Sequence, residues 1–324
     1  MATQSSTDQV VGPVADDSGP GRMADVTVVI PTHNRPALMR RALSSVLEQD
    51  YAGGIEVIVV FDRCEPEHGL EREDPGRRVR VLTNTRSPGL AGSRNTGILA
   101  ATAEYVAFLD DDDAWLPTKL TRQMSALVGE AGAEFSTTAM TVDCQGNLTV
   151  RRVGSSRVHH LDLVRSRMAM LHSSSFLARC AALTGHIGLV DESLPKSMAE
   201  DWDLLLRASR QRPIVHVDEP LVRITWGGAS YFAQQWATRN EAQLWLLAQH
   251  PQIAGDRRGA GRAYGNLAFG CAAQGQRGQA LRWARRALVS NWREPRAYLA
   301  GAVASGVVRW GWLLRTLNSH GHGL

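Results

Sequence analysis

A short apolar segment that ends in four consecutive carboxylates constrains this sequence more than any other feature. Tyr105–Leu109 is long enough for a strand buried on both faces, and Asp110–Asp113 follow at once. In open α/β sheets, ligands bind in the crevice beyond the carboxyl ends of the strands. Four adjacent carboxylates repel one another there unless a cation is present, and oxygen ligands at this density suit Mg²⁺ or Mn²⁺. The alternative is a solvated acidic turn, or a cap for a helix that begins near Thr118.

The first part of the sequence alternates strand-like apolar segments with helical ones. Pro36 suits the first turn of a helix with one apolar face, and the glycine-rich segment 87–95 opens a second helix that runs to about Thr102. Strands are predicted at Val26–Ile30, Ile55–Phe61, Val79–Leu82 and Tyr105–Leu109. This alternation is typical of a parallel α/β sheet.

Polar side chains follow three of the predicted strands, at Thr32-His33-Asn34, at Asp62 and at Asp110–Asp113. Because parallel strands present their carboxyl ends on one edge, we expect these groups to converge in one site. Arg94, at the glycine-rich helix start, adds a guanidinium suited to phosphate oxygens beside free backbone N–H groups. Each feature taken alone has a plainer alternative: a turn, a strand terminator or helix cap, and a surface arginine.

Composition is that of a globular protein in a reducing compartment. Hydrophobic residues make up 44% and charged residues 21%, which is ordinary for a soluble domain. The apolar segment 298–314 is interrupted by Arg309 and is too short for a membrane span, and no signal-peptide pattern is visible. The cysteines lie far apart and show no C-x-x-C spacing, which argues against a zinc site and a disulfide framework: Cys64, Cys144, Cys180 and Cys271. We therefore expect a cytoplasmic protein.

Six short motifs occur in order along about residues 25–230. They are Val-Val-Ile-Pro-Thr-His-Asn-Arg (28–35), Val-Val-Phe-Asp (59–62), Gly-Ser-Arg-Asn-Thr-Gly (92–97), Phe-Leu-Asp-Asp-Asp-Asp (108–113), Gly-Leu-Val-Asp-Glu-Ser-Leu (188–194) and Ala-Glu-Asp-Trp-Asp-Leu (199–204). The ordered set resembles family 2 glycosyltransferases of the GT-A fold. That resemblance implies a Rossmann-like, mostly parallel mixed sheet flanked by helices. It also implies an enzyme whose donor is a UDP-sugar or another nucleotide-diphosphate sugar.

The resemblance assigns donor-binding roles to residues at the strand ends. The loop that begins at Pro31 would hold the nucleobase together with Asp62, which would accept a hydrogen bond from it. His33, where the family often has tyrosine, would stack on the base. Arg94 would reach the diphosphate, and Asp110 would contact the ribose.

The same resemblance makes Asp112 the ligand of a Mg²⁺ or Mn²⁺ ion that bridges the diphosphate, and Asp201 the general base. Glycosyl transfer needs a carboxylate that takes the proton of the acceptor hydroxyl, and a cation that stabilises charge on the departing diphosphate. The implied reaction is a single inverting displacement onto a hydroxyl of a glycan, a lipid-linked or a natural-product acceptor. The alternative for Glu200 and Asp201 is a helix cap. Asp111 occupies a variable position, and Asp113 is expected to be structural.

One departure from the family concerns the lid downstream of the base. Family members often carry there a histidine or arginine that assists the metal or the diphosphate, but the segment Leu221–Tyr231 has no histidine. Arg223 and the Gly227-Gly228 pair would form such a lid. His172 would face the acceptor or be an ordinary core or loop histidine. Trp202 likewise would lie against the acceptor or in the core.

Residues 233–324 are predicted to be all-helical and weakly resemble a tetratricopeptide repeat, with Gly275 at the turn and no second repeat at that period. One such unit cannot bury its own faces, so these helices should pack on the α/β domain or on each other. Residues 251–324 hold 11 arginines, no lysine and two acids, a formal charge of +9, whereas residues 1–250 carry −5. This favours an anionic partner, such as the inner face of the plasma membrane, or a solvated helix face. No nucleic-acid-binding signature occurs.

The sequence thus predicts a disordered tail (1–23), a GT-A domain (24–232) and a helical region (233–324). Two other function classes fit less of it. A phosphatase with an aspartate nucleophile needs a D-x-D-x-T/V loop, whereas Ala114-Trp115 follow the acids here. The other class is a nucleotide-sugar-binding or scaffold protein that acts through the basic helical region. Such a protein would not need every polar residue of the site, yet the sequence has a polar residue at each of these positions, which argues against this class.

Overall fold

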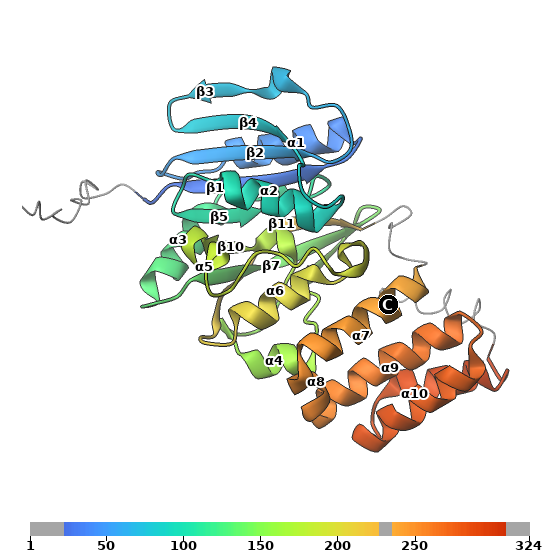
Figure 1. Ribbon diagram of the computed structural model, residues 1–324. Coiled ribbons are helices and arrows are strands. Elements are labelled where there is room, and N and C mark those ends of the chain that lie inside the picture. Colours follow the sequence, from blue (N-terminus) through green and yellow to red (C-terminus); the bar gives the residue numbers. More distant parts are fainter. Residues whose placement is uncertain (1–22, 227–234, 309–324) are drawn as a thin grey trace, which may run out of the picture.

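The computed structural model describes residues 23–226 and 235–308. Within these residues, four parallel strands form the centre of an 11-stranded mixed sheet (Figure 1). Every residue of β1, β2 and β5 is buried, which is why these segments appear in the sequence as continuous apolar runs. The four strands are the predicted ones: β1 (Val26–Thr32), β2 (Ile55–Phe61), β4 (Arg77–Thr83) and β5 (Tyr105–Phe108).

The remaining strands make the sheet mixed, as the predicted fold class requires. Beyond β5 the sheet continues through β10 (Leu177–Arg179), β7 (Phe135–Cys144), β11 (Ile214–Trp226) and β6 (Ala114–Trp115). At the opposite edge lies β3 (Arg72–Asp74), while β8 (Asn147–Arg151) pairs with β7 and β9 (Arg157–Val158) with β11. Strand β10 is antiparallel to β5 and to β7, whereas β7 and β11 are parallel.

Helices cover both faces of the sheet. On one face, α1 (Pro36–Leu47) and α3 (Lys119–Gly129) bury apolar side chains in a core shared with β1, β2 and β7. On the other face, a second core holds residues of α2 (Leu90–Ala100), α4 (His160–Arg165), α5 (Cys180–Thr184) and α6 (Glu200–Ala208). Three short 3₁₀ helices complete this part: η1 (His68–Leu70), η2 (Ser173–Ser175) and η3 (Pro195–Ser197).

Two glycines of the predicted glycine-rich helix allow α2 to lie close to its neighbours. A Cβ at Gly97 would come within 2.3 Å of Cγ1 of Val29 on β1. A Cβ at Gly92 would come within 2.0 Å of the backbone oxygen of Ser87. A side chain at Gly97 would push the helix away from the sheet, and one at Gly92 would displace the segment that leads into the helix start.

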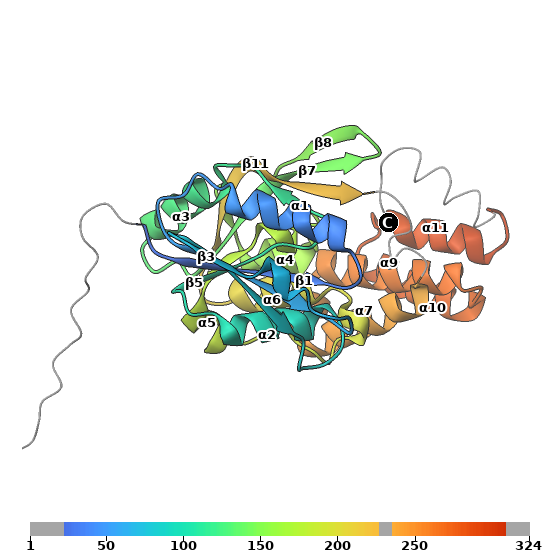
Figure 2. The same cartoon turned by 90° about the horizontal axis from the view of Figure 1, so that it is seen from above.

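The C-terminal region is helical, as predicted. It consists of α7 (Trp236–Gln249), α8 (Pro251–Gly255), α9 (Arg257–Ala273), α10 (Arg277–Ser290) and α11 (Pro295–Ala304). Gly275 ends the turn between α9 and α10 with a φ of 72°, in the left-handed region that favours glycine. These helices lie beside the α/β part on the side away from β3 (Figures 1 and 2). Leu246, Ile253 and Ala263 belong to the same core as α6, so the helical region is packed onto the α/β domain.

Some predictions about the chain ends and the lid need correction or lie outside the described residues. Leu221 to Trp226 form the end of β11, where Arg223 is paired with Ala114 and Thr141, so Arg223 belongs to the sheet and not to a lid. The glycine pair of the predicted lid, the domain boundary at 232/233, residues 1–22 of the predicted tail and residues 309–324 lie outside the described residues. Within the described residues, every helix is too short or too polar to cross a bilayer.

Candidate active site

The acidic segment after β5 meets the loop after β1, as the parallel topology predicted. Thr32 at the end of β1 donates its hydroxyl to Oδ2 of Asp111 (2.8 Å). Nη1 of Arg35 reaches Oδ1 of Asp111 at 3.2 Å and Oδ2 of Asp112 at 3.0 Å. Burial raises the pKa of Asp112, and Asp110 and Asp111 raise it further while Arg35 opposes them. A cation at this point would therefore be favoured electrostatically.

Asp62, at the end of β2, is held ready to accept hydrogen bonds. Its Oδ1 accepts from the side-chain amide of Asn84 (2.9 Å), and its Oδ2 from the backbone N–H of Gly89 (3.1 Å). Burial acts to raise the pKa of Asp62, but these hydrogen bonds outweigh it and hold the pKa below its usual range. His33 is exposed, and its Nδ1 donates to the backbone oxygen of Asp62 (2.6 Å), so the loop after β1 contacts the end of β2.

Arg94 is the deepest charged group of the site. Only 1% of its surface is exposed, and its Nη2 donates to Oδ1 of Asp110 (2.6 Å) and to the hydroxyl of Ser173 (2.9 Å). Its Nη1 forms an ion pair with Glu200, the first residue of α6. Although burial opposes the charge of Arg94, Asp110 and Glu200 raise its pKa, so it stays protonated. The guanidinium thus joins the end of β5 to the start of α6. The resemblance assigned Arg94 to a diphosphate, whereas its partners in the structure are two carboxylates.

Asp201 is the second residue of α6 and faces Arg167. Its two carboxylate oxygens accept from Nη2 of Arg167 at 3.0 and 2.9 Å, and its Oδ1 also accepts from the backbone N–H of Trp202 (2.7 Å). Burial acts to raise the pKa of Asp201, but Arg167 outweighs it and the pKa lies below its usual value. Asp201 is therefore ionised at neutral pH, as a general base must be.

Asp113 and His172 form the inner wall of the acidic segment. Oδ2 of Asp113 accepts from the hydroxyl of Ser174 (2.5 Å), and its Oδ1 accepts from the backbone N–H of Thr225 (3.1 Å). Nδ1 of His172 lies 3.4 Å from Oδ2 of Asp113. Burial raises the pKa of Asp113 well above its usual value, and the neighbouring charges of Asp110 and Asp112 raise it further.

The donor set fits a divalent cation. One carboxylate oxygen each from Asp110 and Asp113 and one ring nitrogen of His172 lie within 4.8 Å of one another, and Asp112 stands next to them with 37% of its side chain exposed. Carboxylate oxygens are the ligands that Mg²⁺ and Mn²⁺ prefer, and a single imidazole is compatible with Mn²⁺. The residues at this position therefore suit the cation that the acidic segment predicted.

Several residues of the site were not predicted from the sequence. Ser173 and Ser174 bind Asp110 and Asp113, and the only signal for them is a run of three serines after His172. Arg167 lies in a segment without any motif. Trp202 is 5% exposed and its Nε1 donates to the backbone oxygen of Leu163, so the core alternative is the correct one for this residue.

Fold and site together define a class of protein. The parallel strands end at a cluster of carboxylates, and a helix with an ionised aspartate is tied to this cluster by a buried arginine. This is the arrangement of GT-A glycosyltransferases. Residues 27–168 match the family model "Glycosyl transferase family 2", so this part of the chain is similar to family 2 glycosyltransferases.

Sequence relatives are bacterial glycosyltransferases. Over 103 residues the chain is 33% identical to "UDP-Glc:alpha-D-GlcNAc-diphosphoundecaprenol beta-1,3-glucosyltransferase WfgD" of Escherichia coli. This match covers 32% of this chain and 41% of that protein. Over 108 residues it is 32% identical to the "GalNAc(5)-diNAcBac-PP-undecaprenol beta-1,3-glucosyltransferase" of Campylobacter jejuni, covering 32% of this chain and 34% of that one. The matches thus span about two fifths or less of these relatives.

Solved structures agree on the fold. Residues 1–349 of S. aureus TarS in complex with UDP-GlcNAc superpose with a TM-score of 0.58 at 15% identity, covering 87% of this chain and 91% of that chain. The same protein in complex with UDP gives a TM-score of 0.56 at 16% identity, with the same coverage. The similarity extends over both the α/β domain and much of the helical region.

Proposed function

We propose that this protein transfers a sugar, with inversion, from a nucleotide-diphosphate sugar to a hydroxyl group of an acceptor, with the help of Mg²⁺ or Mn²⁺. The observation that carries this proposal is the buried bridge from Asp110 through Arg94 to Glu200, because it holds the start of α6, and so Asp201, against the acidic segment. A donor site at the acidic segment and a base at Asp201 would then be adjacent. The printed names of the bacterial relatives, which act on nucleotide sugars and lipid diphosphates, support the substrate class.

On the donor side, the strand-end residues would bind the nucleotide. Pro31 and His33 would flank the base, and Asp62, held ionised by Asn84 and Gly89, would accept a hydrogen bond from it. Asp110 would accept from the ribose, because Arg94 and Ser173 fix the orientation of its carboxylate. The role proposed for Arg94 is therefore to position Asp110 and Glu200, which differs from direct contact with the diphosphate.

Asp112 would hold the cation, and a bound Mg²⁺ or Mn²⁺ would neutralise charge on the departing diphosphate. Arg35 pairs with Asp112, and its 47% exposed side chain leaves it free to turn toward a phosphate. The acidic segment would otherwise repel a diphosphate, so cation binding is expected to precede or accompany donor binding.

On the acceptor side, Asp201 would accept the proton of the attacking hydroxyl. The oxygen would then form the new bond at the anomeric carbon while the bond to the diphosphate breaks on the opposite face, which inverts the configuration. Arg167 keeps Asp201 ionised, and because 45% of its side chain is exposed it can move aside when an acceptor arrives. Both oxygens of the base contact Arg167, so acceptor binding and release of this contact should be coupled.

Thermal unfolding in the presence of nucleoside diphosphates tests this function. A ligand that binds only the native state stabilises it by RT ln(1 + [L]/Kd), where [L] is the free ligand concentration, and so raises the melting temperature. We expect one nucleoside diphosphate to raise it with Mn²⁺ present and to have little effect without the metal. If no nucleotide does so at millimolar concentration with either metal, the transferase proposal is wrong and a scaffold role becomes the better explanation.

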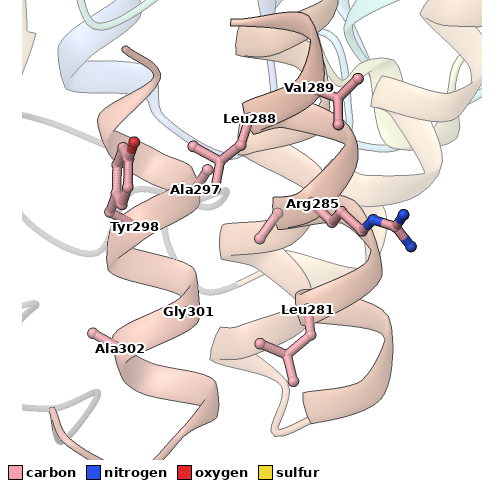
Figure 3. A pocket seen from close by; sticks show the side chains of 9 residues that line it. Leu281, Arg285, Leu288, Val289, Ala297, Tyr298, Gly301 and Ala302 are labelled. Carbon is pink, nitrogen blue, oxygen red and sulfur yellow. The ribbon is translucent and has the colours of Figure 1, made fainter. Parts of the chain in front are cut away.

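For the acceptor, the names of the relatives favour a lipid-linked glycan of cell-envelope polysaccharide synthesis, and the helical region supports this location. Between α10 and α11 lies a hollow of about 530 Å³ with mainly apolar walls and Arg285 at its rim (Figure 3). Leu281, Val289 and Tyr298 beside it are 50%, 75% and 55% exposed. Exposed apolar side chains among arginines are suited to an anionic membrane surface, so we propose that the protein works in the cytoplasm at the inner face of the plasma membrane.

Vesicle sedimentation tests this location. The protein should pellet with vesicles that contain phosphatidylglycerol and stay in solution with pure phosphatidylcholine vesicles. Replacing Arg285 and Val289 together by Ser should weaken the binding, whereas replacing the exposed Val128 on α3 should not. Equal sedimentation with both lipids, or with none, would contradict the membrane role but leave the transferase function untouched.

A further inference from the structure

The motif Gly-Leu-Val-Asp-Glu-Ser-Leu (188–194) contains a carboxylate, Glu192, that is surrounded by hydrogen-bond donors. Its Oε1 accepts from Nε of Arg86 and from the side-chain amide of Asn95 (2.6 Å). Its Oε2 accepts from the hydroxyl (2.6 Å) and the backbone N–H (3.2 Å) of Ser87. Burial acts to raise the pKa of Glu192, but these donors outweigh it and lower the pKa to about 2. Glu192 is therefore an ionised group whose two oxygens are both occupied by the protein itself.

Glu192 is fixed to α2 and reaches from there to the loop that leads into this helix. Asn95 of α2 is 1% exposed, and its side-chain amide also donates to the backbone oxygen of Val190 (2.8 Å) and accepts from the N–H of that residue (2.9 Å). The segment before Glu192 is thus held against α2. Arg86 and Ser87 lie in the loop between β4 and α2, 106 and 105 residues away from Glu192 in the sequence. The carboxylate therefore fixes this loop relative to α2.

The same loop carries two of the groups that orient the carboxylate of Asp62. The side-chain amide of Asn84 donates to Oδ1 of Asp62 (2.9 Å) and to the backbone oxygen of Ser87 (2.9 Å). The backbone N–H of Gly89 donates to Oδ2 of Asp62 (3.1 Å). Nε of Arg63 also reaches Oδ2 (2.9 Å), but it belongs to a side chain that is 60% exposed. Ser87 lies between Asn84 and Gly89 in the chain, so the group that holds Ser87 also fixes these two donors.

We propose that Glu192 is a positioning residue of the donor site, which fixes the loop 84–89 and, through this loop, the direction of the Asp62 carboxylate. A binding group keeps its direction only when its own partners are fixed by the surrounding structure. The inference rests on the proposed function, because Asp62 is the residue proposed to accept a hydrogen bond from the nucleobase. It gives the motif 188–194 a role at the nucleotide, although Glu192 itself would not touch the ligand.

Glu192→Gln is the variant that removes this role with the least change of shape. A glutamine side chain replaces one carboxylate oxygen by an NH₂ group, which donates and does not accept. In one orientation this group faces Arg86 and Asn95, and in the other it faces the backbone N–H of Ser87, so a donor meets a donor in both. The loop should then lose its fixed position. Ser87→Ala removes only the hydroxyl donor and should act in the same direction, but less strongly.

Calorimetric titration of the full chain tests the proposal. The ligand is the nucleoside diphosphate (UDP, GDP, ADP, CDP or dTDP) that stabilises the wild type most, with Mn²⁺ present, at a temperature where each variant is folded. Glu192→Gln should weaken its binding about 10-fold, which corresponds to the loss of one hydrogen bond to a charged group. Such a loss would not come from lower stability alone.

Asp256→Asn is the matched control for that distinction. Asp256 is exposed to a similar extent as Glu192, 18% against 21% of the side chain. It also accepts from an arginine, Arg165, and from backbone N–H groups, here those of Arg258 and Gly259 at the start of α9. Its replacement should lower the melting temperature, because it removes a helix cap, and should leave nucleotide affinity within about twofold of the wild type.

A double-variant cycle shows whether Glu192 acts through the loop. Asn84→Ala removes the contact between the loop and Oδ1 of Asp62 and should itself weaken nucleotide binding. In that background Glu192→Gln should have a clearly smaller further effect than in the wild type, because residues that act through one network are not additive. The same factor in both backgrounds would show that Glu192 does not act through Asn84 and would overturn the inference.

The remaining outcomes separate the inference from the proposed function. If Glu192→Gln melts at a lower temperature but keeps the nucleotide affinity of the wild type, Glu192 only stabilises the fold; the inference fails and the proposed function stands. If Glu192→Gln does not fold, Ser87→Ala decides between the same two results. A wild-type protein that binds none of the nucleoside diphosphates fails both.

Discussion

Asp201 is the residue on which the proposed chemistry depends most directly. Asp201→Asn keeps the shape of the side chain but removes the base, so transfer should fall by about 10²- to 10⁴-fold while nucleotide binding persists. Asp112→Ala should instead lose the metal-dependent binding of the nucleotide. Calorimetric titration with a nucleoside diphosphate and Mn²⁺, beside a transfer assay, measures both. Equal loss of nucleotide binding in the two variants would contradict this division of roles.

Arg167 should set the pH at which the base becomes ionised. Burial acts to raise the pKa of Asp201 and Arg167 lowers it, so Arg167→Gln should raise it. Because the base works only as a carboxylate, the acidic limb of kcat/KM should move to higher pH in this variant. Arg122→Gln is the control, since Arg122 is 61% exposed and faces Glu219 at 3.9 Å. An acidic limb that stays in place would show that another group titrates.

At the scale of single residues, the sequence predicts which strand-end residues lie close together. It does not predict which side chains form ion pairs with one another. Asp62 and the acidic segment follow buried strands, so their convergence could be predicted from parallel topology alone. The partners of Arg94 could not, because Glu200 lies 106 residues away and reaches Arg94 only through the packing of α6. The same holds for Arg167 and Asp201, which are 34 residues apart and belong to no common motif.

At the scale of elements, Arg94 is the link between the sheet and α6. Arg94→Met would leave Asp110 and Glu200 without their buried partner, and breaking a buried ion pair in this way costs about 3–5 kcal/mol. Urea unfolding should show this loss of stability, together with lower transfer activity. Arg122→Met should change stability by no more than about 0.5 kcal/mol. A small loss in Arg94→Met would mean that the two carboxylates do not need the bridge.

The central strands could be predicted from sequence and the outer ones could not, for a physical reason. β1, β2 and β5 are buried on both faces and therefore appear as continuous apolar segments. β11 mixes buried, partly buried and exposed residues, contains Pro220, and shifts its register with β7 on either side of that proline. Its pairing is decided by contacts distant in sequence, which is why the sequence predicted a lid and not a strand for its end.

At the scale of the whole molecule, the helical region is part of the folded unit that holds the base. His250, between α7 and α8, contacts Oδ1 of Asp203 on α6 through Nε2 at 2.8 Å, and both side chains are buried. Arg207 contacts Oδ2 of Asp203 and also the backbone oxygens of Gly188 and Leu189. The helix that carries Asp201 is thus fixed from one side by the sheet and from the other by the helical region. The amphipathic pattern predicted the helices, but not this contact.

Ile253 tests whether the two regions unfold together. It is fully buried in the core that also contains Leu204 of α6 and Ala263 of α9, so Ile253→Ala should cost about 2–5 kcal/mol. Because one core joins the two regions, thermal unfolding should remain a single transition at a lower temperature, when it is followed by circular dichroism and by tryptophan fluorescence. Val289→Ala, at a side chain that is 75% exposed, should change stability by no more than about 0.5 kcal/mol. Ile253→Ala would contradict this if it unfolded in two transitions and a nucleotide shifted only the second one. The α/β domain would then be stable alone, and the helical region would serve only in binding to a membrane.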